Sequence, residues 1–302
     1  MSPAHPPHRP MLALVIRLGA IAAIATMGML IKLVSERGVH LMEILFWRQA
    51  AALPIALALA MMMSGGLSRL KTRRLGTHAV RAAYGVAGMV LNFGAFILLP
   101  LAEATTFGFT APIFAVVLSV ILLREAVGIY RSAAVALGFI GVLVIARPGE
   151  NDIPLLGAAV ALGGAFMIAL ISIQIRDLNR TDKPLAIVFW FAAFSTPFAA
   201  LFLPFVATGH DPAEWALLLG IGVVGTIGQF LLTTALRYGA VASVIVMDYS
   251  SLIWATLYGW LIWDQLPPTA TWLGAPMIIA AGLIIAWREH YLSRTRAAQP
   301  VA

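Results

Sequence analysis

The chain has no cysteine, and only 11% of its 302 residues are charged. The missing thiols exclude disulfides, thiolate metal sites and cysteine nucleophiles. Soluble domains carry about 25% charged residues, so this chain has too few to cover a water-facing surface. With 61% hydrophobic residues, its surplus apolar side chains must face lipid. These deficits exclude a soluble enzyme, a nucleic-acid-binding module and a disordered regulator.

Apolar stretches of the length that a membrane-crossing helix needs, roughly 20 residues, recur along the whole chain. We predict ten spans, at residues 11–33, 41–63, 78–99, 102–123, 131–147, 153–175, 184–207, 214–236, 239–262 and 270–288. The short loops between them contain glycine and proline and leave no room for a soluble domain. The predicted fold class is therefore an all-α polytopic membrane protein.

Lysine and arginine are distributed by membrane side. If the first span starts in the cytoplasm and ten spans alternate, most of these residues fall on the cytoplasmic side, including all those from Arg69 to Arg81. The other side keeps only Lys32, Arg37 and Arg147. This asymmetry follows the positive-inside rule. It predicts an inner (plasma) membrane protein with both termini in the cytoplasm, and it explains the net charge of +7 without nucleic-acid binding.

The two halves of the chain repeat. A Phe-Trp pair with a proline seven residues after the tryptophan occurs in the second span and again in the seventh, as Phe46, Trp47, Pro54 and Phe189, Trp190, Pro197. Five spans per repeat is an odd number, so the halves should lie in opposite senses, which is a transporter architecture with its substrate site near the midplane. We predict a tail at 1–10, repeats at 11–147 and 148–288, and a tail at 289–302.

The stretch from Pro100 to Pro112, the Leu-Leu-Arg-Glu run ending at Glu125, and Arg48 early in the second span are typical of one family. Together with the duplication, they make residues 11–288 resemble the drug/metabolite transporter superfamily, specifically its ten-helix EamA type. The resemblance implies a cavity lined by helices 1–4 and 6–9, with helices 5 and 10 peripheral. The small residues with Trp and Tyr are similar to those of YddG-like amino-acid exporters. Ser251 departs from the family pattern, which has a proline there, so the resemblance does not imply a kink in the ninth helix.

Two spans carry polar stripes with i, i+4, i+8 spacing, which places each stripe on one helix face. They are Tyr84, Gly88 and Asn92 in the third span, and Gly225, Gln229 and Thr233 in the eighth. Small residues of this kind either line a pore or let helices pack closely. Both readings stay open for the glycines, whereas we expect the amides of Asn92 and Gln229 to face the cavity.

The ninth span groups Asp248, Ser251, Trp254 and Tyr258 in one sector of the helix. Asp248 is the only acidic residue well inside a predicted span, and an intramembrane carboxylate is costly enough to suggest function. We expect it either to bind a substrate ammonium in exchange for a proton or to be a buried structural acid.

Two arginines also fall inside spans. We expect Arg17 to extend to the cytoplasmic headgroups, as long basic side chains do. Arg48 could do the same on the other side, hold a substrate carboxylate or form part of a gate. Trp47 and Trp190 fit an interfacial belt, and their repeat-related positions also suit a pair of gates.

No set of residues has the spacing of a catalytic triad, a metal site or a phosphate-binding loop, so we predict no catalytic residues, no cofactor and no ATP binding. We predict a secondary transporter that exports small metabolites, most of all neutral or aromatic amino acids, by alternating access. The expected partners are a small-molecule substrate and membrane lipid. The alternatives are a carrier of another class, such as a nucleobase, vitamin or drug, and a membrane-embedded enzyme acting on lipids.

Overall fold

The computed structural model describes residues 10–123, 129–146, 154–238 and 246–298, and in these ranges it contains helices and turns but no strand. The helices are α1 (Pro10–Glu36), α2 (Leu41–Met62), η1 (Gly66–Leu70), α3 (Leu75–Leu98), α4 (Leu101–Gly108), α5 (Ala111–Leu123), α6 (Ile129–Ala146), α7 (Leu155–Leu178), α8 (Pro184–Ala200), α9 (Leu203–Val206), α10 (Pro212–Tyr238), η2 (Val246–Ser250), α12 (Ser251–Trp263) and α13 (Thr269–Ala298). The predicted fold class is confirmed.

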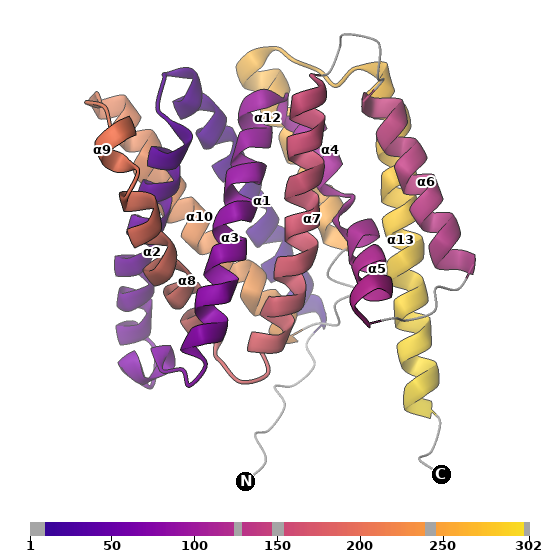
Figure 1. Cartoon of the computed structure of the whole chain (residues 1–302), viewed down its shortest axis with the longest axis horizontal. Coiled ribbons are helices and arrows are strands. Elements are labelled where there is room, and N and C mark those ends of the chain that lie inside the picture. The colour runs from indigo at the N-terminus through magenta and orange to yellow at the C-terminus, as the bar shows by residue number, and fades with distance from the viewer. Residues whose placement is uncertain (1–9, 124–128, 147–153, 239–245, 299–302) are drawn as a thin grey trace.

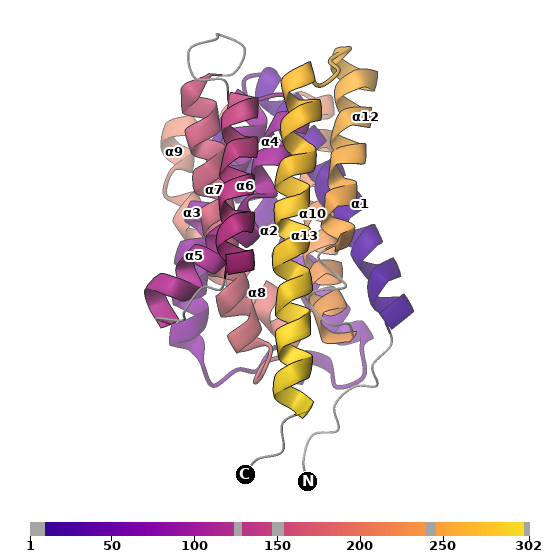
Figure 2. The ribbon, with the colours of Figure 1, turned by 90° about the vertical axis from the view of Figure 1, so that its right-hand side faces the viewer.

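The helices stand side by side as a bundle (Figures 1 and 2). Seven helical segments in the described ranges are long and apolar enough to cross a membrane, and α6 and α8 are shorter apolar helices. The start of α1 and the end of α13 lie at the same end of the bundle (Figure 2). We call this the terminal end and the opposite one the distal end.

The fourth predicted span is broken into α4 and α5 at Phe109 and Thr110. Pro112 explains the break, because it has no N–H to donate and its ring clashes with the carbonyl four residues earlier in a continuous helix. The Thr110 hydroxyl donates to the carbonyl of Phe107 at 2.7 Å and caps the end of α4. The sequence predicted one span at residues 102–123, bent at this proline, and the structure divides it into two helices.

Two further predicted spans change geometry along their length. The seventh stops at Ala200 and resumes at Leu203 as the short α9, which carries Pro204 in its first turn. In the ninth, the 3₁₀ helix η2 gives way to α12 at Ser251. The residue at this change of geometry is a serine and not a proline. The Ser251 hydroxyl donates to the carbonyl of Asp248 at 2.6 Å. Residues 239–245 of that span lie outside the described ranges.

The predicted boundary of the last span differs from the end of the helix in the structure. Helix α13 continues to Ala298, ten residues beyond the predicted end at 288, so much of the predicted tail is helical. Its added residues include Glu, Arg, Ala and Leu, which favour helix in water as well as in lipid. The predicted N-terminal tail lies outside the described residues, apart from Pro10.

Packing runs between the two halves of the chain. Helix α1 packs on α10 and α7 packs on α3, while α2 contacts α10 and α8 contacts α3. Helices α2 and α8 also contact each other, as do α6 and α13. The contacts of one half therefore recur in the other with the partners exchanged.

The pair α6 and α13 stands at one edge of the bundle (Figure 1). These are the fifth and tenth predicted spans, which the family resemblance placed at the periphery. A Cβ atom on Gly274 of α13 would come within 2.6 Å of the carbonyl oxygen of Gly141 on α6. The two backbones thus approach closely because both residues lack side chains.

Candidate functional site

Two buried arginines meet at one aromatic ring between α2, α3 and α8. Arg48 of α2 is 5% exposed and Arg81 of α3 is 3% exposed. Their guanidinium carbons lie 5.8 Å and 4.2 Å, respectively, from the ring centroid of Phe191 on α8. We call these three residues the arginine centre.

Glycines make room for both guanidinium groups. A Cβ atom on Gly85 would lie 2.4 Å from Arg81 Nη1 and 2.4 Å from the Phe191 ring. A Cβ atom on Gly225 of α10 would lie 3.3 Å from Arg48 Nε. The backbones of α3 and α10 therefore border the arginine centre directly. A side chain at Gly85 or Gly225 would collide with the arginines.

A short chain of hydrogen bonds through uncharged side chains starts at Arg48. Its Nη1 donates to Gln49 Oε1, and Gln49 Nε2 donates to Ser195 Oγ. Ser195 Oγ donates in turn to the carbonyl of Phe191 at 2.5 Å. Arg48 Nε and the Nε and Nη1 atoms of Arg81 are buried without a hydrogen-bond partner. In the described ranges no carboxylate lies within 4.0 Å of either arginine, so the centre holds two positive charges without a counter-ion.

At the distal end, Glu43, Trp47, His210, Glu214 and Trp215 form a cluster that we call the distal latch. His210 Nε2 lies 2.7 Å from Glu43 Oε1, and His210 Nδ1 lies 3.1 Å from Glu214 Oε2. Trp47 donates to Glu43 Oε1 at 3.4 Å and packs edge-on against Trp215, with ring centroids 4.8 Å apart. The latch joins the start of α2 to the loop before α10.

Protonation strengthens this latch. Burial on its own lowers the pKa of His210, but the hydrogen bonds to Glu43 and Glu214 and their charges outweigh burial and raise the pKa above its ordinary value of 6.5. The imidazolium then donates to both carboxylates. Because the pKa is raised in the closed form, the latch is fully stabilised below the ordinary pKa and weakens as the pH rises through the raised value.

We expect the distal end to open more often at alkaline pH. The chain has no cysteine, so a Leu218→Cys variant, at a position that is 1% exposed and packed with Ile44 of α2, reports opening of the distal end through its rate of thiol labelling. Labelling should speed up between about pH 6 and about pH 9 by more than it does in the same variant carrying His210→Gln, which cannot form the imidazolium. The second variant corrects for the pH dependence of the thiol itself. Equal pH dependence in both would show that His210 does not hold the distal end closed.

Trp190, the repeat partner of Trp47, lies near the terminal end. Its indole N–H donates to the carbonyl of Leu70 in η1 at 2.8 Å. Nearby, Arg74 pairs with Asp177 and His78 lies 3.8 Å from Asp182. These contacts join the start of α3 to the end of α7 and to the loop after it. The two tryptophans that were predicted as possible gates thus make contacts at opposite ends of the bundle.

The predicted polar stripe of α3 contacts α7. Asn92 Nδ2 donates to the carbonyl of Gly88 at 2.7 Å and to that of Gly164 on α7 at 3.4 Å. A Cβ atom on Gly88 would lie 2.8 Å from Ile171. Tyr84 is exposed. Gly88 and Asn92 therefore make the helix-packing contacts that were the alternative to lining a cavity.

The three residues of the predicted stripe on α10 have different surroundings. Gly225 faces Met27 and Arg48 and so borders the arginine centre. Thr233 is buried and its hydroxyl donates to the carbonyl of Gln229 in its own helix at 2.7 Å. Gln229 is half-buried. Of the three residues of this stripe, Gly225 is the one that borders the arginine centre.

The sector on the ninth span contacts α1. Asp248 accepts two hydrogen bonds from Arg17, at 2.6 Å from Nε and 2.5 Å from Nη2. Tyr258 shares a hydrogen bond of 2.8 Å with Thr26, and its ring is tilted against that of Trp254. The prediction that Arg17 extends to the headgroups is wrong, because its side chain is 8% exposed and bonded to Asp248. The acid that appeared isolated in the sequence has an arginine partner 231 residues away.

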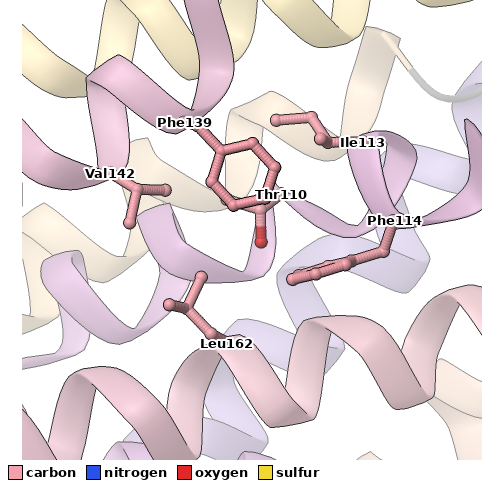
Figure 3. Close-up of a pocket in the computed structure, with 6 residues that line it drawn as sticks. All are labelled: Thr110, Ile113, Phe114, Phe139, Val142 and Leu162. Atoms are coloured by element: carbon pink, nitrogen blue, oxygen red, sulfur yellow. The ribbon is translucent and has the colours of Figure 1, made fainter. Parts of the chain in front are cut away.

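Two hollows in the described part of the bundle are apolar. One void beside the break between α4 and α5 is lined by Thr110, Ile113, Phe114, Phe139, Val142 and Leu162 (Figure 3), and it has no room for a molecule of the size of water. A groove of about 620 Å³ runs between α3 and α8, with Ala83, Ala87 and Phe194 among its lining residues. Neither has the polar groups that would orient a substrate.

Sequence reasoning missed most of the arginine centre. Arg81 was counted on the cytoplasmic side because it lies near the start of the predicted span 78–99, and Phe191, Gln49 and Ser195 stood out in no pattern. One signal was available, because Arg81, Gly85, Gly88 and Asn92 are spaced i, i+4, i+7, i+11 and so lie along one side of α3.

Two comparisons bear on this geometry. The EamA-like transporter family matches residues 11–147 and, a second time, residues 155–287. The chain belongs to this family. A crystal structure with 18% sequence identity superposes with a TM-score of 0.65 over 92% of this chain and 98% of the other, which supports the same fold.

The names of the relatives specify different substrates. A riboflavin transporter of Vibrio cholerae is 31% identical over 75% of this chain and 77% of its own length. The pseudopaline exporter CntI of Pseudomonas aeruginosa is 31% identical over 87% of this chain and 92% of its own. The chain is thus a multi-span membrane protein of a metabolite transporter family, and the family's members differ in substrate.

Proposed function

We propose that this EamA-family protein is a secondary transporter that exports small organic metabolites, amino acids and their close derivatives first, by alternating access around the arginine centre. The observation that carries the proposal is a buried, charged centre between α2, α3 and α8, with side-chain contacts between helices at each end of the bundle. A site of this kind is reached from one side only after the distal latch or the contacts of Trp190 open.

The orientation belongs to the same proposal. We place the terminal end in the cytoplasm and the distal end outside, because lysine and arginine concentrate in the loops of the terminal end. We also take residues 11–147 and 148–288 as inverted repeats, with Trp47 and Trp190 as equivalent gate residues. The exchanged packing of α1 on α10 and α7 on α3 supports this pairing.

A carrier of another metabolite class is the second candidate. It is favoured by the relatives whose names specify riboflavin and pseudopaline. The neutral, aromatic amino acids expected from the sequence need few charged contacts, whereas the structure puts two unpaired arginines in the centre. The proposal therefore keeps amino acids but relies on their carboxylate rather than on their side chains.

Flux through the purified protein tests the proposal. Proteoliposomes preloaded with unlabelled phenylalanine should accumulate labelled phenylalanine by counterflow, and Gly85→Val should reduce this about tenfold or more, since the added side chain displaces Arg81 and Phe191. Gly76→Val, at a position with no neighbouring atoms, is the matched control and should keep its activity. Counterflow of riboflavin without any amino-acid flux would favour the second candidate. An absence of flux for every solute would contradict the transporter assignment.

A further inference from the structure

We propose that the arginine centre binds the carboxylate of the transported molecule, with Arg48 and Arg81 together replacing its water of hydration. This inference rests on the proposed function and names the chemical class of the substrate. Cargoes without a carboxylate are then excluded, and amino acids are bound by their common end.

The charge balance of the protein points to a missing anion. Elsewhere in the described ranges, buried or half-buried cations have partners: Arg17 pairs with Asp248 and Arg74 pairs with Asp177. Lys32 donates to the carbonyl of Leu99 at 2.8 Å. Arg48 and Arg81 instead face the same ring without a carboxylate within 4.0 Å. Two like charges in a water-poor interior repel and are poorly solvated, so an anion that enters is held strongly.

The unused hydrogen-bond donors have the right chemistry for a carboxylate. Arg48 Nε, Arg81 Nε and Arg81 Nη1 are buried and unpartnered. Guanidinium groups bind carboxylates through short, charge-assisted hydrogen bonds in their own plane. Both guanidinium groups lie over the ring of Phe191, which has no hydrogen-bond acceptor in its plane for their N–H groups.

Depth favours a small molecule over a lipid headgroup. Arg48 lies seven residues from the distal start of α2, and Arg81 six residues from the terminal start of α3. At 1.5 Å per residue, both are anchored about 10 Å inside the bundle, from opposite ends. A headgroup fixed at either surface does not reach this level.

The surroundings of the centre favour an organic anion over an inorganic one. Met89 Sδ lies 3.8 Å from Arg48 Nη1, and Met27 and Phe191 border the same space. Methionine and phenylalanine side chains adapt to apolar parts of a ligand. The structure therefore points to a carboxylate attached to an apolar or aromatic body.

Binding to the purified full chain in detergent tests this without requiring flux. Three probes share one benzyl side chain: N-acetylphenylalanine is an anion, phenylalanine is a zwitterion of the same size as phenylalaninamide, and phenylalaninamide lacks the carboxylate. We expect the first two to bind at least about tenfold more tightly than the amide. Arg48→Gln and Arg81→Gln should each remove this preference, and Arg81→Lys should keep part of it because the charge remains.

Controls separate binding from folding. Arg69→Gln changes a half-buried arginine of η1 whose side chain hydrogen-bonds to Ser64, and it should bind like the parent. Each Gln variant of the centre removes an unpaired buried charge, so its melting temperature should not fall. If a Gln variant does not fold, Arg81→Lys and an Arg48→Lys variant decide the matter through partial loss of affinity.

Several results would overturn the inference. They are equal binding of the acid and the amide, unchanged affinity in Arg48→Gln and Arg81→Gln, and displacement of N-acetylphenylalanine by inorganic phosphate or by phosphatidylglycerol vesicles at equal concentration. Carboxylate-dependent binding without counterflow would support the carboxylate site and contradict only the proposed transport. Counterflow of phenylalaninamide at the rate of phenylalanine would support transport and contradict the carboxylate site.

Discussion

Replacing Asp248 by asparagine is expected to lower thermal stability sharply and to reduce counterflow about tenfold or more, because it leaves Arg17 buried without its counter-ion. Breaking a buried ion pair from one side costs about 3–5 kcal/mol. The lower end applies here, since the Asp248 side chain keeps 34% of its surface exposed. Thermal unfolding in detergent and counterflow in liposomes, both compared with the parent protein, measure the two effects.

A double variant separates structure from transport at this pair. Arg17→Met with Asp248→Leu replaces both charges by apolar side chains of similar size, and such replacements are often neutral for stability. If the pair only joins α1 to η2, the double variant should regain both stability and flux. A stable but inactive double variant would show that Asp248 takes part in transport, as the sequence alone suggested. Unchanged stability in the Asp248→Asn single variant would contradict the ion pair itself.

Gly274→Ala is expected to destabilise the protein by about 1–3 kcal/mol, the usual cost of overpacking. The new methyl group would meet the Gly141 carbonyl oxygen at 2.6 Å and the Ile145 side chain at 2.4 Å, so α6 and α13 would have to separate. Gly76→Ala adds the same methyl group where no atom lies within 4 Å, and it should leave the melting temperature unchanged or slightly raised. Equal melting temperatures for the two variants would show that α6 and α13 do not depend on this close approach.

Hydropathy and duplication were sufficient to predict the fold because each membrane span must satisfy its own backbone and face lipid over a fixed length. Local chemistry limited the detail: Pro112 lies inside an apolar run and breaks a helix that composition alone would continue. The end of α13 was missed because the signal used was lipid exposure, and a helix does not stop where lipid does.

The site was harder to predict because periodicity gives the face of a helix but not the neighbour of that face. Asn92 was assigned correctly to one stripe, yet only the structure shows that this stripe contacts α7. Arg17 and Asp248 each looked isolated, since their pairing joins the first and ninth spans. Arg81 was hidden by its position near a span end, where a long basic side chain normally reaches water.

The exchange of packing partners between the halves has a consequence for biosynthesis. Helices α2 and α3 emerge from the ribosome long before α8, so Arg48 and Arg81 enter the membrane before Phe191 exists to cover them. Helix α1 likewise waits for α10, and Arg17 for Asp248. The first half therefore lacks these contacts until the second is made. Its packing is complete only in the full chain, so we expect the two halves to fold together.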